Sequence, residues 1–123
     1  MCLFISKRLV TMKTAKTCKT EIWVGLREGY SDIVHTMNDV TLIISNFVDE
    51  KKECVTITPT EFWYVNGWEP GVIIGFINYP RFPSHPSAMK NRAIELAKIF
   101  KTEFKQIRIS VTTPDITYML EDE

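Results

Sequence analysis

Cysteine is scarce in this chain of 123 residues, and its three copies, Cys2, Cys18 and Cys54, lie far apart. An odd number without a C-x-x-C pair fits neither a disulfide framework nor a zinc site and suits a reducing cytoplasm. Long hydrophobic runs are also missing. The apolar start is followed by Lys7 and Arg8 and is too short for a signal peptide or a membrane-spanning helix. We therefore expect no metal and no membrane partner.

An excess of charge of one sign is missing too. Fifteen Lys and Arg residues balance fifteen Asp and Glu residues, so no overall field draws in DNA, RNA or a membrane surface. No glycine-rich phosphate loop of the form G-x-x-x-x-G-K or G-x-G-x-x-G occurs, and no cofactor is expected. An anionic partner must therefore be recognised by a local pocket.

The periodicity of the apolar residues predicts an α+β domain, with two helices covering one face of a mainly antiparallel sheet. The expected order is β-α-β-β-β-α-β, with a final edge strand left open. The expected elements are strand 21–26, helix 37–49, strands 55–58, 62–65 and 72–77, a helix capped by Ser84 or Ser87 with its buried stripe over 93–104, strand 107–112 and the optional strand 116–120.

Residues 21–123 are expected to form this single domain, after a flexible N-terminal extension at 1–20 whose sequence has no such periodicity. Thr36 is a predicted N-cap, and Asn66-Gly67 a predicted type I′ hairpin turn. Pro59 is expected to bend or interrupt its strand. The segment 72–77 is apolar on both faces, which predicts a strand covered on each side and hints at a partner subunit.

The strand period sends Trp23, Arg27, Arg108 and the row of Thr56 to the face opposite the predicted core. Guanidinium groups can fork onto phosphate oxygens while an aromatic ring stacks on a base, which is the chemistry that a nucleotide requires. Surface ion pairs for the arginines and an oligomer interface for Trp23 explain the same pattern. Periodicity alone leaves both interpretations open.

Catalytic patterns are weak in this sequence. His85-Pro86-Ser87 matches one half of a paired H-x-T or H-x-S phosphoesterase motif, but His35-Thr36-Met37 fails as the other half. Cys54 has no local histidine or asparagine to activate its thiol. We therefore expect no catalytic residues and a protein that is not an enzyme.

Two unusual runs carry a family resemblance: VGLREGY (Val24–Tyr30) and EPGVIIGFINYPRFP (Glu69–Pro83). With their flanking sequence they resemble the phage-encoded Thoeris anti-defence sponge proteins, the first family of that kind described. The resemblance extends from about Glu21 to Glu123.

The resemblance implies a phage or prophage protein in the cytoplasm of the infected bacterium. It would capture glycocyclic ADP-ribose made by a bacterial TIR protein, keep the ligand intact and so block Thoeris immunity. It also implies dimers that build a hexamer, with pockets at the dimer interface, and separate sites for cyclic di- or trinucleotides in some members.

Carried over by position, the resemblance assigns the phosphate-reading arginines to Arg27 and Arg108, and the base-side contacts to Phe82 and Asn91. The reasoning from the residues themselves, and not the resemblance, adds Trp23 and Tyr30 to the predicted ligand site. Three rivals remain: a regulatory domain that binds ordinary mononucleotides, an oligomeric scaffold, and a weak cyclic-nucleotide phosphoesterase that uses His85.

Overall fold

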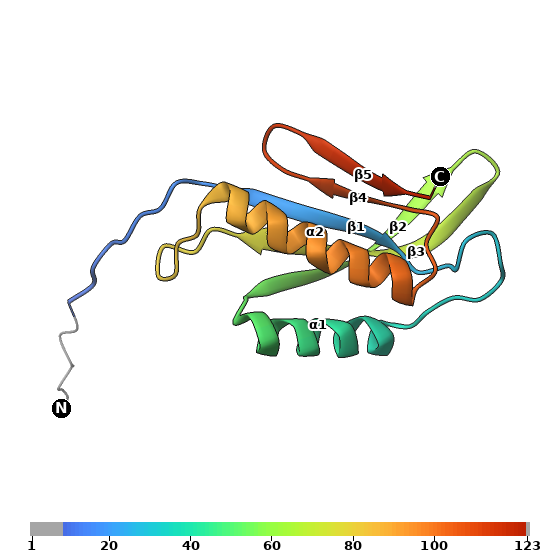
Figure 1. Cartoon of the computed structure of the whole chain (residues 1–123), viewed down its shortest axis with the longest axis horizontal. Coiled ribbons are helices and arrows are strands. Elements are labelled where there is room, and N and C mark those ends of the chain that lie inside the picture. Colours follow the sequence, from blue (N-terminus) through green and yellow to red (C-terminus); the bar gives the residue numbers. More distant parts are fainter. Residues whose placement is uncertain (1–8, 123) are drawn as a thin grey trace, which may run out of the picture.

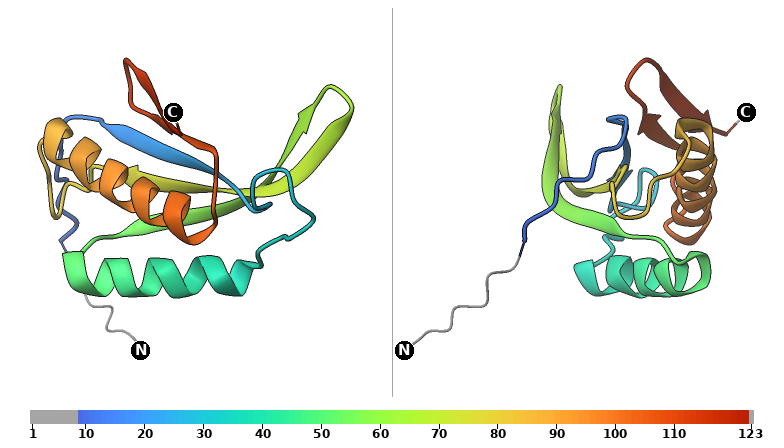
Figure 2. Two further views of the ribbon diagram at one scale, coloured as in Figure 1. Left: turned by 45° about the vertical axis from the view of Figure 1, so that its right-hand side comes forward. Right: turned by 90° about the vertical axis from the view of Figure 1, so that its left-hand side faces the viewer.

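The computed structural model describes residues 9–122 and confirms the predicted α+β class. All strand pairs are antiparallel, and the sheet order is β2-β3-β1-β4-β5. Both helices lie on one face of the sheet (Figures 1 and 2). The first six elements form a ferredoxin-like β-α-β-β-α-β unit, to which β5 adds an edge strand. The elements are β1 (Lys19–Gly25), α1 (Met37–Lys51), β2 (Val55–Tyr64), β3 (Gly67–Ile77), α2 (Pro86–Glu103), β4 (Arg108–Thr112) and β5 (Thr117–Glu121).

The core lies between the sheet and the helices. Alternate residues of β1, β3 and β4 point toward the helices, which is the burial that strand alternation produces. The apolar stripes of α1 and α2 pack onto this face, and Phe47 of α1 meets Phe76 of β3 edge to face at 6.4 Å between ring centroids. The buried core residues include Ile22, Val24, Val40, Ile44, Phe47, Val72, Ile74, Phe76, Met89, Ala93, Leu96, Ala97, Phe100, Ile109 and Val111.

The helix starts follow local capping chemistry. Thr36 caps α1 as predicted, and its hydroxyl accepts from the backbone N–H of Asp39 while the Asp39 carboxylate accepts from the N–H of Thr36. The cap of α2 is His85 rather than either predicted serine. Its side chain accepts from the N–H of Ser87, and Pro86 fills the first helical turn, where its missing N–H costs nothing.

Pro59 does not divide β2. The two strands expected on either side of it are one ten-residue strand, in which Pro59 lies opposite Val72 of β3. Because β2 is at the edge of the sheet, no partner strand requires the N–H that proline lacks. The hairpin turn that follows has Asn66 at φ 64°, but the predicted type I′ turn at Asn66-Gly67 is wrong. Gly67 pairs with Tyr64 as the first residue of β3 and has no positive φ, so the turn residues are Val65 and Asn66.

No element within residues 9–122 covers the face of the sheet away from the helices (Figure 2). Ile73 is half-buried and Ile77 is exposed, so the expected cover on both faces of β3 is provided on one face only. The β2–β3 hairpin extends past the ends of both helices (Figure 2) and carries stacked, exposed Trp63 and Trp68. Within residues 9–122, neither helix is long and apolar enough to cross a membrane.

Candidate functional site

The loop that follows β1 is held tightly against the end of the sheet. The N–H of Leu26 donates to the carbonyl of Pro70 at 3.0 Å, and the N–H of His35 donates to the carbonyl of Leu26 at 2.7 Å. An isolated bridge joins Arg27 to Val34, and Gly29 takes up a φ of 47° that favours glycine. These bonds fix the base of the loop, from which the Arg27 side chain extends.

Three of the predicted site residues meet at this end of the sheet. Arg27, Tyr30 and Arg108 line one small hollow of about 110 Å³, although Arg108 follows Arg27 by most of the chain length. Among residues 9–122, the Arg27 side chain makes a single, long 3.5 Å hydrogen bond to the carbonyl of Ser31, and Arg108 lies 3.6 Å from the carboxylate of Glu121. Both guanidinium groups are therefore loosely engaged and free to reach an anion.

Glu69 and Gln106 line the same hollow, and sequence reasoning missed both. A Glu69 carboxylate oxygen accepts from the backbone N–H of Arg27 at 3.3 Å, and the Gln106 amide donates to the carbonyl of Arg27. A Cβ on Gly25 would lie 2.9 Å from Glu69 Oε2 and 3.0 Å from Gln106 Oε1, so glycine makes room for both side chains. The sequence holds no local signal for this arrangement, because it depends on the pairing of β1 with β3, which sets Gly25 opposite Gly71, close to Glu69 in the chain.

Trp23 lies on the open face of the sheet, as the strand period predicts, but outside the arginine hollow. Its indole N–H donates to the Thr112 hydroxyl at 3.2 Å, and its ring meets Phe62 edge to face at 6.5 Å. The Phe62 ring in turn covers Gly71 so closely that a Cβ there would lie 2.1 Å from it. Trp23 is thus part of an aromatic surface beside the hollow.

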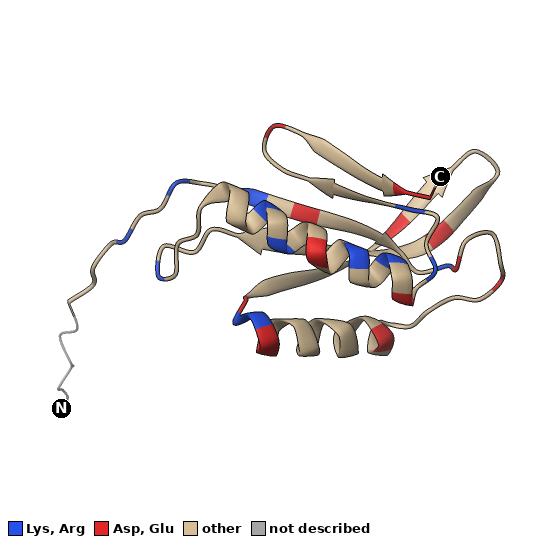
Figure 3. Cartoon of the chain, viewed as in Figure 1, with Lys and Arg blue, Asp and Glu red and all other residues tan. Residues whose placement is uncertain are grey.

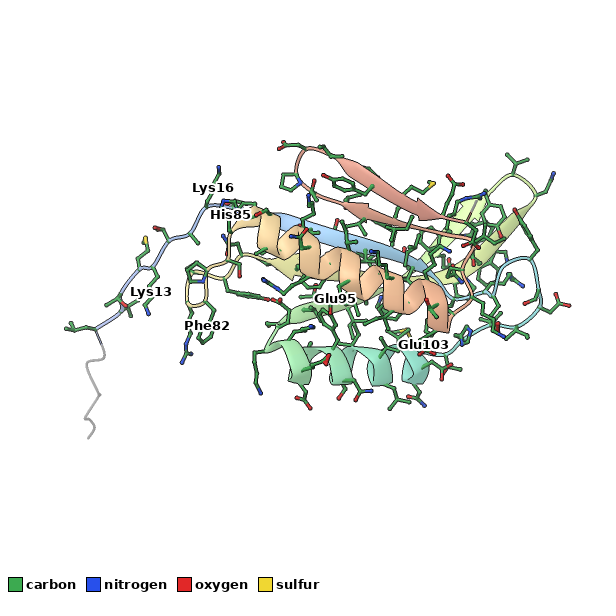
Figure 4. The ribbon with its side chains drawn as sticks, viewed as in Figure 1. Lys13, Lys16, Phe82, His85, Glu95 and Glu103 are labelled. Carbon is green, nitrogen blue, oxygen red and sulfur yellow. The ribbon has the colours of Figure 1, made fainter. Side chains whose placement is uncertain are left out.

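Phe82 and Asn91 lie at the other end of the molecule. Phe82 is in the loop before α2 and Arg108 follows α2, a helix of 18 residues and so ~27 Å long. Figure 4 shows the separation, because Phe82 and Glu103 are labelled near opposite ends of this helix. Asn91 is exposed on the first half of α2. A single chain therefore does not bring the predicted base contacts and the predicted phosphate contacts together.

The Phe82 end has a larger hollow, of about 480 Å³. Phe82 itself is 73% exposed, and the guanidinium of Arg81 lies 5.3 Å from the centre of its ring. Arg92 is held on the wall by Glu53 and by the Ser84 hydroxyl at 2.9 Å. Basic side chains and an exposed ring thus occur at this end also, although positive and negative residues are interspersed over residues 9–122 (Figure 3).

Two solved structures share this fold. A phage SAM lyase in complex with S-methyl-5′-thioadenosine has a TM-score of 0.77 at 16% sequence identity, with 94% of this chain and 97% of that chain covered. The phage SAM lyase in its apo state has a TM-score of 0.78 at 15% identity, with 94% and 98% covered. No protein-family model matches the chain, and no curated protein matches its sequence.

This comparison corrects one prediction from the sequence. The expectation that the chain is not an enzyme is wrong on this finding, because the fold neighbours are a lyase. The relation to a phage protein is in line with the resemblance described above, at the level of the fold. The likeness at this identity concerns the fold and assigns no residue.

The two histidines are too far apart for shared catalysis on one phosphate. His85 begins α2, whereas His35 precedes α1 at the opposite end of the molecule (Figure 1). His35 stacks on Phe104 at 4.2 Å and lies 3.5 Å from carboxylates of Glu28 and Asp39. Among residues 9–122 there is also no cluster of three His, Cys, Asp or Glu side chains that could hold a metal ion.

Proposed function

We propose that this chain binds a cyclic ADP-ribose-type nucleotide in the cytoplasm of a phage-infected bacterium and so keeps the signal from the Thoeris effector. The observation that carries the proposal is the convergence of Arg27, Arg108 and Tyr30 on one hollow. Two guanidinium forks suit a diphosphate, and an exposed aromatic ring can stack on a base. The VGLREGY run, which contains Arg27 and Tyr30, supports the same ligand class.

The weak engagement of the two arginines favours binding energetically. Each charge-assisted hydrogen bond to a shielded phosphate contributes ~1.5–3 kcal/mol. Since Arg27 and Arg108 give up only long contacts, little of that gain is lost in breaking existing bonds. Competition with an effector requires nanomolar affinity, which corresponds to about 12 kcal/mol. The arginines supply a share of it, and further contacts are needed.

A second copy of the chain would provide these contacts. Phe82 and Asn91 lie at the end of α2 remote from Arg108, so an antiparallel dimer would set the Phe82 end of one copy against the arginine hollow of the other. Exposed Ile77, Trp63 and Trp68 offer unpartnered apolar surface for such an assembly. A dimer-based oligomer with shared sites is therefore part of the proposal. A hexamer is supported only by the family resemblance.

The test is a binding experiment with purified protein and glycocyclic ADP-ribose. Affinity would be measured by calorimetry, and the retained ligand would be released by heating and identified by mass spectrometry. Arg27→Ala, Arg108→Ala and Arg27→Lys form the variant set. Lys98→Ala, which removes an exposed positive charge from α2 and touches no wall of the arginine hollow, is the matched control.

We expect each arginine-to-alanine change to weaken binding at least tenfold, which is ~1.4 kcal/mol, with the fold retained. Arg27→Lys should also weaken binding, because an ammonium cannot fork onto phosphate. If both alanine variants bind the ligand as tightly as the parent, the arginine hollow is not the binding site. Absence of binding to any cyclic ADP-ribose isomer would reject the ligand class.

A second candidate function is cleavage of SAM, the activity named for the fold neighbours. Glu69 favours it, because a half-buried carboxylate facing the same hollow would attract the sulfonium cation of SAM. Incubation with SAM should then yield S-methyl-5′-thioadenosine, and Glu69→Gln should abolish the yield. A lack of product with the parent protein would exclude this candidate.

A further inference from the structure

A separate hollow of about 510 Å³ lies at the start of α2, between the beginning of β1 and the turn that joins β4 to β5. Its size is within the range of small-molecule sites. Figure 4 labels Lys16 and His85 at this end of the molecule, whereas the arginine hollow lies beyond the other end of α2. The two hollows share no lining residue.

Thr20 gives this hollow a polar group that lacks a partner. The residue is 1% exposed, and its hydroxyl has no hydrogen-bond partner among residues 9–122. By strand alternation its side chain lies on the helix side of β1, with Ile22, and it lines the hollow. Buried hydroxyl groups are nearly always hydrogen-bonded, so an unpartnered one that faces a hollow points to a ligand.

The surroundings of Thr20 favour an anion. The N-terminus of α2, an 18-residue helix, opens onto the hollow through Pro86 and Ser87 and brings the positive end of the helix dipole. Lys16 and Lys90 line it as well, and within the described part of the chain neither forms an ion pair. Asp115 is its single acidic lining residue.

An apolar surface lies beside these positive groups. The ring of Tyr118 lines the hollow, and the Lys90 ammonium is 5.4 Å from its centre. A ligand with a phosphate on the helix terminus could place a ring or sugar against Tyr118 while Lys90 contacts the phosphate. A helix N-terminus, two lysines, an unpartnered hydroxyl and an aromatic ring around one hollow are typical of a site for a small organic phosphate.

We propose that this hollow binds a small phosphate monoester, with the phosphate at the N-terminus of α2 within reach of Lys90, Lys16 and the Thr20 hydroxyl. The ester group lies against Tyr118. The ligand is a nucleoside monophosphate or a sugar phosphate, which share this chemistry. The site is independent of the function proposed above, since its residues lie apart from Arg27 and Arg108.

The experiment titrates the full chain with AMP, ribose 5-phosphate and inorganic phosphate, with affinity measured by calorimetry and the site located by amide chemical shifts. The variants are Lys90→Ala and Thr20→Val, and Lys98→Ala is the control on the same helix. Thr20→Val keeps the shape and removes only the unpartnered hydroxyl, so the free protein should fold normally. We expect Lys90→Ala to weaken ester binding about tenfold and Thr20→Val about fivefold, with Lys98→Ala unchanged.

Arg108→Ala separates the two sites, because it should leave ester binding at this hollow intact. Tight binding of AMP alone would assign a nucleotide, and equal binding of AMP and ribose 5-phosphate would assign a sugar phosphate; both support the site. The proposal is overturned if neither ester binds, if Lys90→Ala and Thr20→Val bind as the parent does, or if Arg108→Ala abolishes the binding.

Discussion

The side-chain amide of Gln106 donates a hydrogen bond to the backbone carbonyl of Arg27, although 79 positions separate them in the chain. Gln106 is buried and also donates to the carbonyl of Phe104 at 3.3 Å. It therefore ties the loop after β1 to the segment that enters β4. Because Arg108 begins β4, this side chain, together with the pairing of β1 with β4, holds the two arginines at one end of the sheet.

Replacing Gln106 with leucine should destabilise the protein and weaken the arginine site. The Arg27 carbonyl loses its donor, which costs ~1–3 kcal/mol of unfolding free energy when the group stays buried. Urea denaturation measures this loss, and calorimetry measures the affinity for glycocyclic ADP-ribose. Thr102→Ala, an exposed change on the last turn of α2, is the control. Unchanged stability in Gln106→Leu would show that water replaces the amide.

Gly25→Ala should impair binding more than folding. The new Cβ would lie 2.9 Å from Glu69 Oε2 and 3.0 Å from Gln106 Oε1, and both are ends of side chains that can move aside. Gly71→Ala is the contrast, because its Cβ would lie 2.1 Å from the Phe62 ring and 2.9 Å from the carbonyl oxygen of Val24. We expect a larger drop in melting temperature for Gly71→Ala. The opposite ranking would contradict the packing described here.

Asp39 should make the stability of α1 sensitive to acid. The backbone N–H of Thr36 donates to the Asp39 carboxylate and holds the pKa of this group below its ordinary value of 3.8. A lowered folded pKa means that the stabilisation is present above the unfolded pKa and is lost as pH falls through the folded pKa. Asp39→Asn should therefore be less stable than the parent at pH 7, and the difference should shrink below pH 3.8. Thermal melts in which the stability difference between parent and variant does not change with pH would show that the charge of Asp39 does not stabilise α1.

A shared site between two copies predicts complementation between variants. Phe82→Ala and Arg108→Ala should each lose binding as homodimers. In a heterodimer purified by two different tags, one interface site combines both defects and the other has neither, so about half of the sites should regain parent affinity. No recovery in such heterodimers, or no heterodimer to purify, would contradict the antiparallel arrangement.

The local features of this fold were predictable because they depend on neighbours in the chain. Alternation in β1 and β4 set Trp23 and Arg108 on the face opposite Ile22 and Val111, as the strand register confirms. The Thr36 cap and the positive φ of Asn66 follow from the backbone conformations that these residues favour, although the turn itself is placed one residue earlier than predicted. Pro59 escaped this reasoning, because its tolerance depends on β2 being an edge strand.

The sequence by itself therefore determined the fold class, the element types and the two faces of the sheet, and it supplied the arginines proposed to bind phosphate. Tertiary structure alone decided which of those residues meet. The strand order and register bring Glu69 and Gln106 to Arg27, and the length of α2 carries Phe82 away from Arg108. The physical reason is range: strand alternation and helix caps act over a few residues, whereas a site is assembled by pairings between segments that no local pattern specifies.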